Sequence, residues 1–334
     1  MRAGLVLAVG PNGAGKTNLL EALHVGTQGF SPRTRRESRL VRFGEEAAGV
    51  TVAGTRAAAR MEVDVELRRN GGKRVALNGA PLRTMDELRM RIATLVFVPE
   101  RLVIVKGSPA VRRAYFDRVL TRLLPARAAL PGDYAAAVGQ RNTALRRVAA
   151  GVSGPDALEP WTARVATLGQ ELSEARRQVV SQLANSFAAR ALELGLPEAR
   201  LVHESRPVSV EELDARLERD LERGWTGAGA HLEDIGLASG ERDLRTFGSQ
   251  GEQRIAVLAL LLAEAELLTE RGPAPPLLLL DDVLSELDSE RRAALAERIG
   301  SCGQALVTAT SASALPVEPA QLVEVRPGSA RTIA

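Results

Sequence analysis

The feature that most constrains this chain is a glycine-rich loop directly after the apolar run Leu5–Val9. The loop reads G-x-x-x-x-G-K-T, and its residues are Gly10, Pro11, Asn12, Gly13, Ala14, Gly15, Lys16 and Thr17. In such a loop the glycines let backbone N–H groups surround a phosphate, the lysine reaches the β- and γ-phosphates, and the hydroxyl binds Mg²⁺. A helix is predicted to open at Thr17 and to add its N-terminal dipole. The pattern therefore predicts an ATP site, which also includes Asn18.

A second apolar run, Leu277–Leu280, ends in two acids, Asp281 and Asp282. A carboxylate at the end of a buried strand is costly unless it holds a cation, so we predict that Asp281 and Thr17 are the Mg²⁺ ligands. We predict that Asp282 orients or deprotonates the attacking water, with Lys16 as the second catalytic residue. For each acid the alternative is a structural cap at the end of a strand.

The charge of the chain is distributed unevenly. Among its 334 residues, positions 1–150 hold 26 Lys and Arg against 12 Asp and Glu, whereas positions 151–334 hold 18 against 29. The basic half is expected to attract a polyanion such as DNA, although it could instead dock on the acidic half. Aromatic residues make up only 3% of the chain, which argues against base stacking as the main mode of binding.

Composition also excludes several classes of protein. The single Cys302 excludes disulfides and cysteine-rich zinc sites. The sequence has no run of 18 apolar residues and no signal peptide, so we expect a cytoplasmic protein without a membrane span.

The order of patterns predicts an α/β fold, namely a P-loop ABC-type ATPase head with mixed β-sheets and an inserted helical lobe. Apolar residues alternate with charged ones over Arg60–Arg69, which predicts an antiparallel sheet. The middle of the chain has apolar residues at helical spacing. The predicted helices there are Ala110–Leu124, Asp133–Val148, Leu158–Leu194 and Glu211–Arg223. The predicted domains are 1–109 and 231–334, which form the head, and the helical lobe 110–230.

Ser249, Gln250 and Gly251 lie just before a predicted helix, Gln253–Arg271, in the segment F-G-S-Q-G-E-Q-R. From the residues alone this segment is a helix cap with a capping box. Together with S-E-L-D at Ser285–Asp288, it also resembles the signature motif and D-loop of the ABC-type ATPases. That resemblance implies that the signature of one protomer caps the γ-phosphate held by the P-loop of its partner, through a second anion site at a helix N-terminus.

Five segments together resemble the RecF family of bacterial recombination-mediator ATPases, which are relatives of the SMC-type heads. They are P-N-G-A-G-K-T-N-L-L-E-A, V-P-E-x₆-G-S-P-x-x-R-R-x-Y-F-D (Val98–Asp117), Q-R-N-x-x-L-R (Gln140–Arg146), S-Q-G-E-Q-R and L-L-L-D-D-V-L-S-E-L-D. The resemblance implies that the protein binds duplex DNA and gap junctions, forms an ATP-dependent homodimer and hydrolyses ATP slowly. It further implies roles in DNA repair, replication and the SOS response, in which RecR and RecO help to load RecA at single-strand gaps.

Three positions depart from the family. Met1 stands just before the P-loop strand, where the family has a preceding strand pair, which implies a misassigned start or reduced contacts to the base. Leu232 replaces the arginine of a G-P-H-R-D-D segment, which calls a contact of the lobe into question. Thr310 replaces the switch histidine of transporters, which argues against the alternative of an ABC transporter-type subunit. A non-hydrolysing ATP-binding scaffold is the other alternative.

Overall fold

The computed structural model describes residues 1, 3–34, 36–56, 59–285 and 287–333. The chain divides into two compact units. The first consists of Met1–Arg101, Glu193–Gly195 and Val257–Ala334, and the second consists of Leu102–Leu192 and Leu196–Ala256. The predicted domain limits at 109/110 and 230/231 both lie within the second unit.

A six-stranded mixed sheet forms the centre of the first unit, with strand order β13-β12-β1-β11-β10-β6. All neighbouring pairs are parallel except β12 and β13. The strands are β1 Leu5–Val9, β6 Thr94–Phe97, β10 Leu277–Leu280, β11 Ala305–Ala309, β12 Gln321–Arg326 and β13 Ser329–Thr332. Because Val9 pairs with Ala309 and Leu280 pairs with Val307, the carboxyl ends of β1, β10 and β11 meet at one edge of the sheet.

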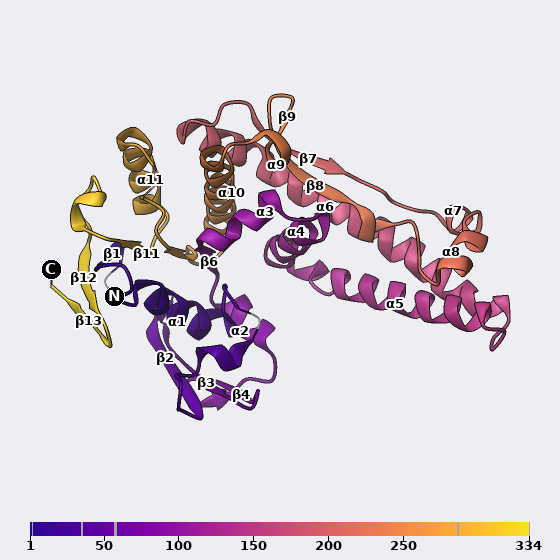
Figure 1. The fold of residues 1–334 in the computed structure, drawn as a ribbon, viewed down its shortest axis with the longest axis horizontal. Coiled ribbons are helices and arrows are strands. Elements are labelled where there is room, and N and C mark those ends of the chain that lie inside the picture. The colour runs from indigo at the N-terminus through magenta and orange to yellow at the C-terminus, as the bar shows by residue number, and fades with distance from the viewer. Residues whose placement is uncertain (2, 35, 57–58, 286, 334) are drawn as a thin grey trace. The chain divides into compact units, whose positions relative to one another are not determined.

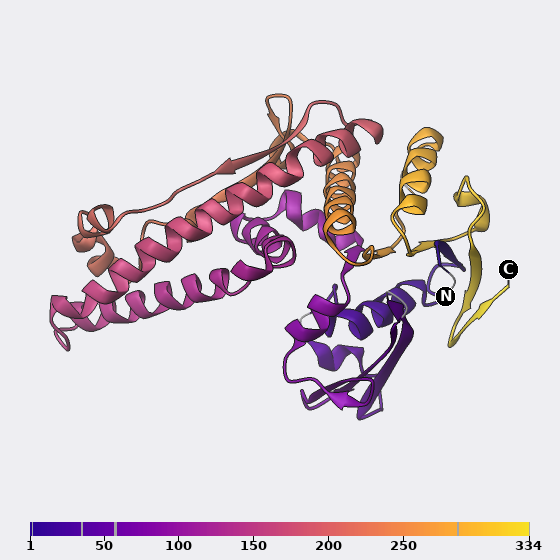
Figure 2. The same cartoon turned by 180° about the vertical axis from the view of Figure 1, so that it is seen from behind.

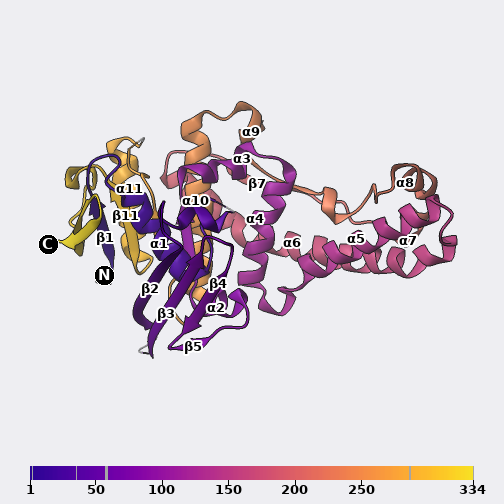
Figure 3. The ribbon, with the colours of Figure 1, turned by 60° about the horizontal axis from the view of Figure 1, so that its bottom comes forward.

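A four-stranded antiparallel sheet packs against the helix that follows the P-loop (Figure 3). Its strands are β2 Ala47–Arg56, β3 Ala59–Arg68, β4 Lys73–Leu77 and β5 Ala80–Pro81. The predicted alternation is confirmed, since Val63, Val65 and Leu67 are buried and share a core with Val25 of α1. The helices of this unit are α1 Lys16–Gln28, α2 Met85–Arg91 and α11 Ser289–Ser301.

The second unit is mainly helical. Figures 1 and 2 show its two longest helices, α5 and α6, running side by side. Its helices are α3 Val103–Lys106, α4 Pro109–Leu123, α5 Leu130–Ala149, α6 Glu159–Glu193, α7 Val210–Asp214, α8 Leu217–Arg223 and α9 Leu244–Phe247. Helix α10, Gln250–Arg271, begins in this unit and ends in the first. The α/β fold with an inserted helical lobe is thus confirmed.

One local prediction for the second unit was wrong, and one of its sheets was not predicted. The predicted helix Glu211–Arg223 is two helices, and the break re-aims α8 so that Leu217 and Leu221 pack on the core around Leu145. The unit also contains an unpredicted three-stranded antiparallel sheet of β7, β8 and β9. Its strands are β7 Ala199–Glu204, β8 Asp234–Ser239 and β9 Arg242–Asp243. The pairing of β7 with β8 joins residues far apart in the sequence, so no local pattern announced it.

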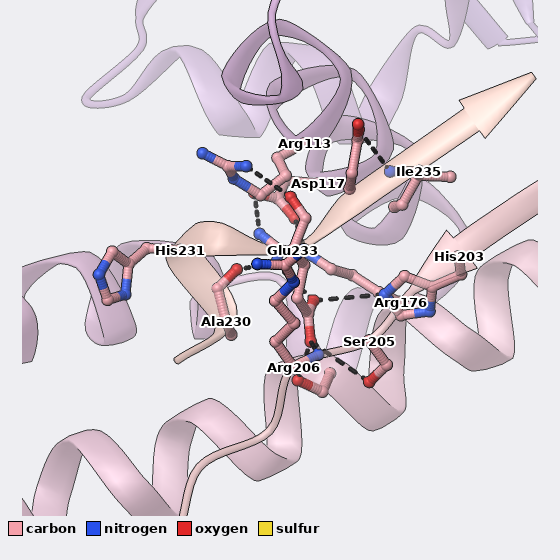
Figure 4. A network of polar contacts seen from close by, with 12 residues as sticks. Arg113, Asp117, Arg176, His203, Ser205, Arg206, Ala230, His231, Glu233 and Ile235 are labelled. Carbon is pink, nitrogen blue, oxygen red and sulfur yellow. Dashed lines mark hydrogen bonds and ion pairs between the residues drawn. The ribbon is translucent and has the colours of Figure 1, made fainter. Parts of the chain in front are cut away.

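A buried polar network ties the helices of the second unit to this sheet (Figure 4). Glu233 is fully buried and accepts hydrogen bonds from Arg176 Nη1 at 2.9 Å and from the hydroxyl of Ser173. Arg176 also binds both oxygens of Asp117, at 2.8 and 2.9 Å. Asp234 binds Arg112 twice, at 2.6 Å. The acids next to Leu232 therefore hold α4 and α6 to β8 without an arginine at position 232.

Candidate nucleotide-binding site

The predicted phosphate-binding loop connects the end of β1 to the start of α1. Gly13 and Gly15 have φ values of +80° and +103°, in the left-handed region that glycine adopts without strain. The Lys16 ammonium folds over the loop and donates to the carbonyl oxygens of Gly10 at 2.7 Å and Pro11 at 3.0 Å. The Lys16 ammonium thus bridges two carbonyl groups of the loop, and the N-terminus of α1 directly follows the loop. Both the ammonium and the helix N-terminus favour an anion.

Asp281 directly follows β10, and the structure brings it into contact with Thr17 of the loop. Its carboxylate is 5% exposed and accepts hydrogen bonds from the Thr17 hydroxyl at 2.9 Å and the Thr308 hydroxyl at 2.7 Å. Neither partner carries a charge, and no lysine or arginine of the described residues forms an ion pair with Asp281. A buried carboxylate without a basic partner is costly unless a cation neutralises it.

The residues present fit a magnesium ion. Mg²⁺ prefers hard oxygen ligands and binds through one or two protein groups, with water and phosphate completing its shell. Thr17 and Asp281 place a hydroxyl and a carboxylate oxygen 2.9 Å apart beside the phosphate loop. Among the described residues no three His, Cys, Asp or Glu side chains gather into a metal cage. Such a pair of ligands therefore suits a metal that arrives with a nucleotide.

Asp282 is exposed and follows directly on the same edge of the sheet. Its φ is +48°, a left-handed conformation that Asp tolerates better than most residues. Its backbone N–H donates to the Thr308 hydroxyl at 3.0 Å, and its carbonyl oxygen accepts from Ser285 at 3.2 Å. The backbone is thus fixed on both sides of the carboxylate, which suits a group that has to orient a water molecule.

Thr308 is the residue that sequence reasoning missed. It is fully buried on β11, the strand between β1 and β10, and its hydroxyl joins Asp281 to the backbone of Asp282. A hydroxyl residue inside the otherwise apolar strand A-L-V-T-A was the available signal, because a buried hydroxyl needs a polar partner. Its role became visible only once the strand order placed β11 beside β10.

The signature segment lies in the second compact unit, where it caps its own helix. Ser249 accepts from the N–H of Glu252 at 3.2 Å, and the Glu252 carboxylate accepts from the N–H of Ser249 at 2.7 Å. This is the capping box expected from the residues alone. Gln250 and Gly251 are exposed in the first turn, where backbone N–H groups lack intrahelical acceptors. The contact of Ser249 with a partner's nucleotide stays a prediction.

The segment after the two acids begins helix α11. The Asp288 carboxylate accepts from the N–H of Arg291 at 2.9 Å and caps that helix. Glu286, in the middle of the predicted D-loop, lies outside the described residues. None of the described helices is long and apolar enough to span a membrane.

Comparisons with known proteins agree with the resemblance of the motifs. Residues 1–332 match the family model of the RecF/RecN/SMC N-terminal domain. The DNA replication and repair protein RecF of Myxococcus xanthus is 35% identical over 329 residues, which cover 92% of this chain and 85% of that protein. The RecF of an Anaeromyxobacter strain is 36% identical, over 90% and 85% of the two chains.

Solved structures give the same result. A structure of the recombination mediator protein RecF with ATP has a TM-score of 0.88 and 29% identity, and the match covers all of this chain and 92% of the other. An SMC head bound to the winged-helix domain of ScpA has a TM-score of 0.58 at 16% identity, over 99% and 90% of the chains, which supports the fold alone.

Proposed function

The chain belongs to the RecF family, and from this premise we propose that it is an ATP-dependent, DNA-binding protein of DNA replication and repair. One observation carries the nucleotide part of the proposal. Asp281 is a buried carboxylate whose partners among the described residues are two hydroxyl groups, and one of these belongs to Thr17 of the phosphate loop. A magnesium–ATP complex supplies both the cation for Asp281 and the phosphates for the loop.

Each residue of the edge has a proposed task. The amides of Gly10–Thr17 and the Lys16 ammonium bind the phosphates, while Thr17 and Asp281 hold Mg²⁺, which neutralises charge on the phosphates. Lys16 would exchange its two carbonyl partners for phosphate oxygens, which are stronger acceptors because they are charged. Asp282 takes the proton of the attacking water or orients that water, and we expect turnover to be slow.

The proposed active form is a dimer. Ser249 accepts one hydrogen bond in its capping box, and its O–H, which contacts the Glu252 carboxylate, would exchange that partner for a phosphate oxygen. Together with the first-turn amides of Gln250 and Gly251 it would cap the γ-phosphate bound by a second copy. ATP would then hold two chains together, because a ligand shared across an interface adds its binding energy to association.

DNA is the proposed macromolecular ligand. Residues 1–101 hold 17 Lys and Arg against 10 Asp and Glu, which gives this part of the chain an excess of positive charge. We place the protein in the cytoplasm and propose, from family membership, that it acts with RecR and RecO to help load RecA at gaps between duplex segments.

Lys16→Ala tests the site, and Lys106→Ala serves as the matched control because Lys106 is exposed in the second unit. Lys16→Ala should lose ATP binding in a calorimetric titration, since the phosphates lose their lysine, whereas Lys106→Ala should bind as the wild type does. Lys16→Arg should bind ATP but turn over poorly, because a planar guanidinium replaces a compact charge. Normal turnover by Lys16→Ala would refute the site, and ATP binding by the wild type without any turnover would favour a scaffold.

Mixing two inactive variants tests the dimer. Ser249→Arg should bind ATP through its own Lys16 but stay monomeric, because it places bulk and charge where the γ-phosphate would lie. A heterodimer of Ser249→Arg with Lys16→Ala holds one intact composite site, so part of the ATPase activity should return on mixing. A dimer that forms without ATP, or a Ser249→Arg monomer with normal turnover, would refute the shared site.

The salt dependence of DNA binding tests the basic surface. If six or more phosphates are contacted, affinity should fall about a thousandfold or more between roughly 50 and 200 mM salt. We expect binding to require ATP and duplex DNA to compete at least as well as single strands. A flat salt dependence would contradict the proposal that phosphate contacts dominate.

A further inference from the structure

One aromatic side chain of the first unit stands almost completely in solvent. Phe43 is 97% exposed, the highest value among the large apolar side chains that the structure describes. It lies between the 3₁₀ helix Glu37–Leu40 and strand β2. Two residues earlier, Val41 is 5% exposed and packs into the core of the antiparallel sheet. The local chain therefore directs Val41 inward and leaves Phe43 outside, where an isolated protein gains nothing from an aromatic ring.

The turn that carries Phe43 is held in one conformation. The N–H of Glu45 donates to the carbonyl oxygen of Arg42 at 3.0 Å, and Gly44 has a φ of +91°, as the third position of a type II turn requires. The Arg69 guanidinium spans the turn from the neighbouring strand region and donates to the carbonyl oxygens of Glu45 at 2.7 Å and Arg42 at 2.5 Å. Phe43 is thus presented on a braced support, which lowers the entropy cost of binding a ligand.

Phe43 forms one wall of a hollow of about 450 Å³, a volume within the range of small-ligand pockets. The hollow is lined by Ser38, Arg39, Val41, Phe43 and Arg69. The Arg39 side chain has no ion pair in the described part of the chain. The hydrogen bonds that Arg69 donates go to uncharged carbonyl groups, and no carboxylate among the described residues forms an ion pair with it. Glu37, the acid nearest to Arg39 in sequence, is paired with Lys73, and Glu66, the acid nearest to Arg69, is paired with Arg68. Glu45 and Glu46 are not among the described residues that line the hollow.

The chemistry of the hollow selects its ligand. A flat apolar ring binds the face of another flat ring, and two unneutralised guanidinium groups bind anions. A nucleotide carries both chemical groups, since its base stacks on an aromatic ring while its phosphates bind arginine. A peptide anchored by an apolar side chain would instead need an apolar floor, and apart from Phe43 the only large apolar side chain lining this hollow is the buried Val41.

We propose that the Phe43 hollow binds one unpaired nucleotide of single-stranded DNA, with the base on Phe43 and the flanking phosphates on Arg39 and Arg69. This inference rests on the proposed function, DNA binding. In duplex DNA the base faces are covered by their neighbours, so only a single strand or a gap can reach the ring. A single stacking position agrees with the scarcity of aromatic residues. Phosphate contacts supply most of the affinity, and Phe43 distinguishes gapped DNA from intact duplex.

The test compares Phe43→Ala with the wild type on a gapped duplex and on a blunt duplex, with ATP present and over a series of salt concentrations. Loss of one stacked base should weaken binding to the gapped duplex about tenfold and leave the blunt duplex unchanged. In a plot of the logarithm of affinity against the logarithm of salt concentration, Phe43→Ala should have the same slope as the wild type. Arg39→Ala should make the slope on the gapped duplex shallower by about one, because one phosphate contact is lost. Trp225→Ala, which removes an exposed aromatic ring from the second unit, is the control and should bind both DNAs normally.

Two conservative variants sharpen the test. Phe43→Trp should retain binding, and the fluorescence of the new indole should be quenched by oligo-dT, whereas Phe43→Leu should bind like Phe43→Ala because leucine cannot stack. Wild-type affinity of Phe43→Ala or Phe43→Leu for gapped DNA would overturn the inference, as would an equal loss on both DNAs. So would a Phe43→Ala variant that binds DNA normally but has lost binding to an acidic peptide. In each of these cases the proposed function survives, whereas failure of the wild type to bind any DNA would refute both.

Discussion

Two regions of this molecule bury carboxylates in opposite ways. At the nucleotide edge of the first unit, Asp281 is 5% exposed and accepts hydrogen bonds from two threonine hydroxyls. In the second unit, Asp220 and Glu233 are at most 1% exposed, and each lies within 3 Å of an arginine, at 2.8 Å from Arg141 and 2.9 Å from Arg176. The first carboxylate has no basic partner among the described residues, whereas each of the other two is paired with an arginine.

This difference distinguishes a carboxylate suited to ligand binding from a carboxylate that forms a structural ion pair. A buried acid paired with arginine is complete, and removing either partner leaves an uncompensated charge. A buried acid with only neutral partners is complete only when a cation binds, so the fold tolerates its cost in exchange for affinity for that cation. The comparison therefore supports the proposal that Asp281 binds a ligand, and it predicts that the arginine-paired acids stabilise the helical lobe.

The largest expected effect concerns Asp282, which lies on the nucleotide edge but is exposed. Asn tolerates the left-handed backbone at this position, so Asp282→Asn changes the charge without new strain. Loss of a general base should lower turnover about 10²- to 10⁴-fold while ATP binding stays intact, because Asp281 still holds Mg²⁺. Phosphate release and ATP titration measure the two quantities. Normal hydrolysis by Asp282→Asn would make this residue a structural cap.

Matched substitutions of the two kinds of buried acid test the comparison directly. Asp220→Asn strands the Arg141 guanidinium and should lower the free energy of unfolding by about 3–5 kcal/mol. Asp281→Asn removes an uncompensated charge, so the free energy of unfolding should change by less than about 1 kcal/mol or rise. Asp281→Asn should lose magnesium-dependent ATP binding. Asp220→Asn should still bind ATP with Mg²⁺ at temperatures at which this variant remains folded. Urea denaturation measures the stabilities, and equal losses in both variants would remove the distinction.

Acid should weaken the helical lobe through Glu233. Burial by itself raises the pKa of this carboxyl, but hydrogen bonds from His203, Ser173 and Arg176 outweigh burial and lower the pKa from 4.5 to about 2. A depressed folded-state pKa contributes stability that is present above the unfolded value and is lost as the pH falls toward 2. That contribution is about 3 kcal/mol, and it should vanish between about pH 5 and pH 2.

The variant Glu233→Gln is the control for this pH dependence. It should be less stable than the wild type at pH 7, and its free energy of unfolding should vary less between pH 5 and pH 2. Denaturation at a series of pH values, followed by circular dichroism, gives both curves. Parallel curves for the two proteins would show that other carboxyl groups cause the acid sensitivity.

The smallest expected effect concerns Thr308, which supports the nucleotide edge from behind. Thr308→Val keeps the shape of the side chain but removes the hydroxyl that bonds Asp281 and the backbone of Asp282. Loss of such a supporting hydrogen bond should weaken magnesium affinity about tenfold. Thr308→Ser keeps the hydroxyl and should retain most of the affinity. Titration of Mg²⁺ into the ATP-bound protein measures both, and equal affinity of Thr308→Val and the wild type would make Thr308 a packing residue.

Much of the architecture could be predicted because many strands follow from the pattern of apolar and charged residues over a few neighbouring positions. Strands Leu5–Val9 and Leu277–Leu280 are confirmed at both ends, since apolar runs bounded by glycine or acid leave little choice of register. The alternation in β3 likewise predicted a sheet with one buried face. The break at Ala215 and Arg216 was not predictable in this way, because the amphipathic pattern continues across it and only packing against α5 decides the direction of α8.

By itself, the sequence determined the chemistry at the ends of β1 and β10, because a phosphate loop and a strand-end acid depend on neighbouring residues alone. The tertiary structure decided what surrounds that chemistry. It placed Thr308 between the two acids, paired Glu233 with an arginine more than fifty residues away and left Phe43 outside the core. Strand order and helix packing join residues that are distant along the chain, and those pairings depend on which buried surfaces fit together, which no short stretch of sequence contains.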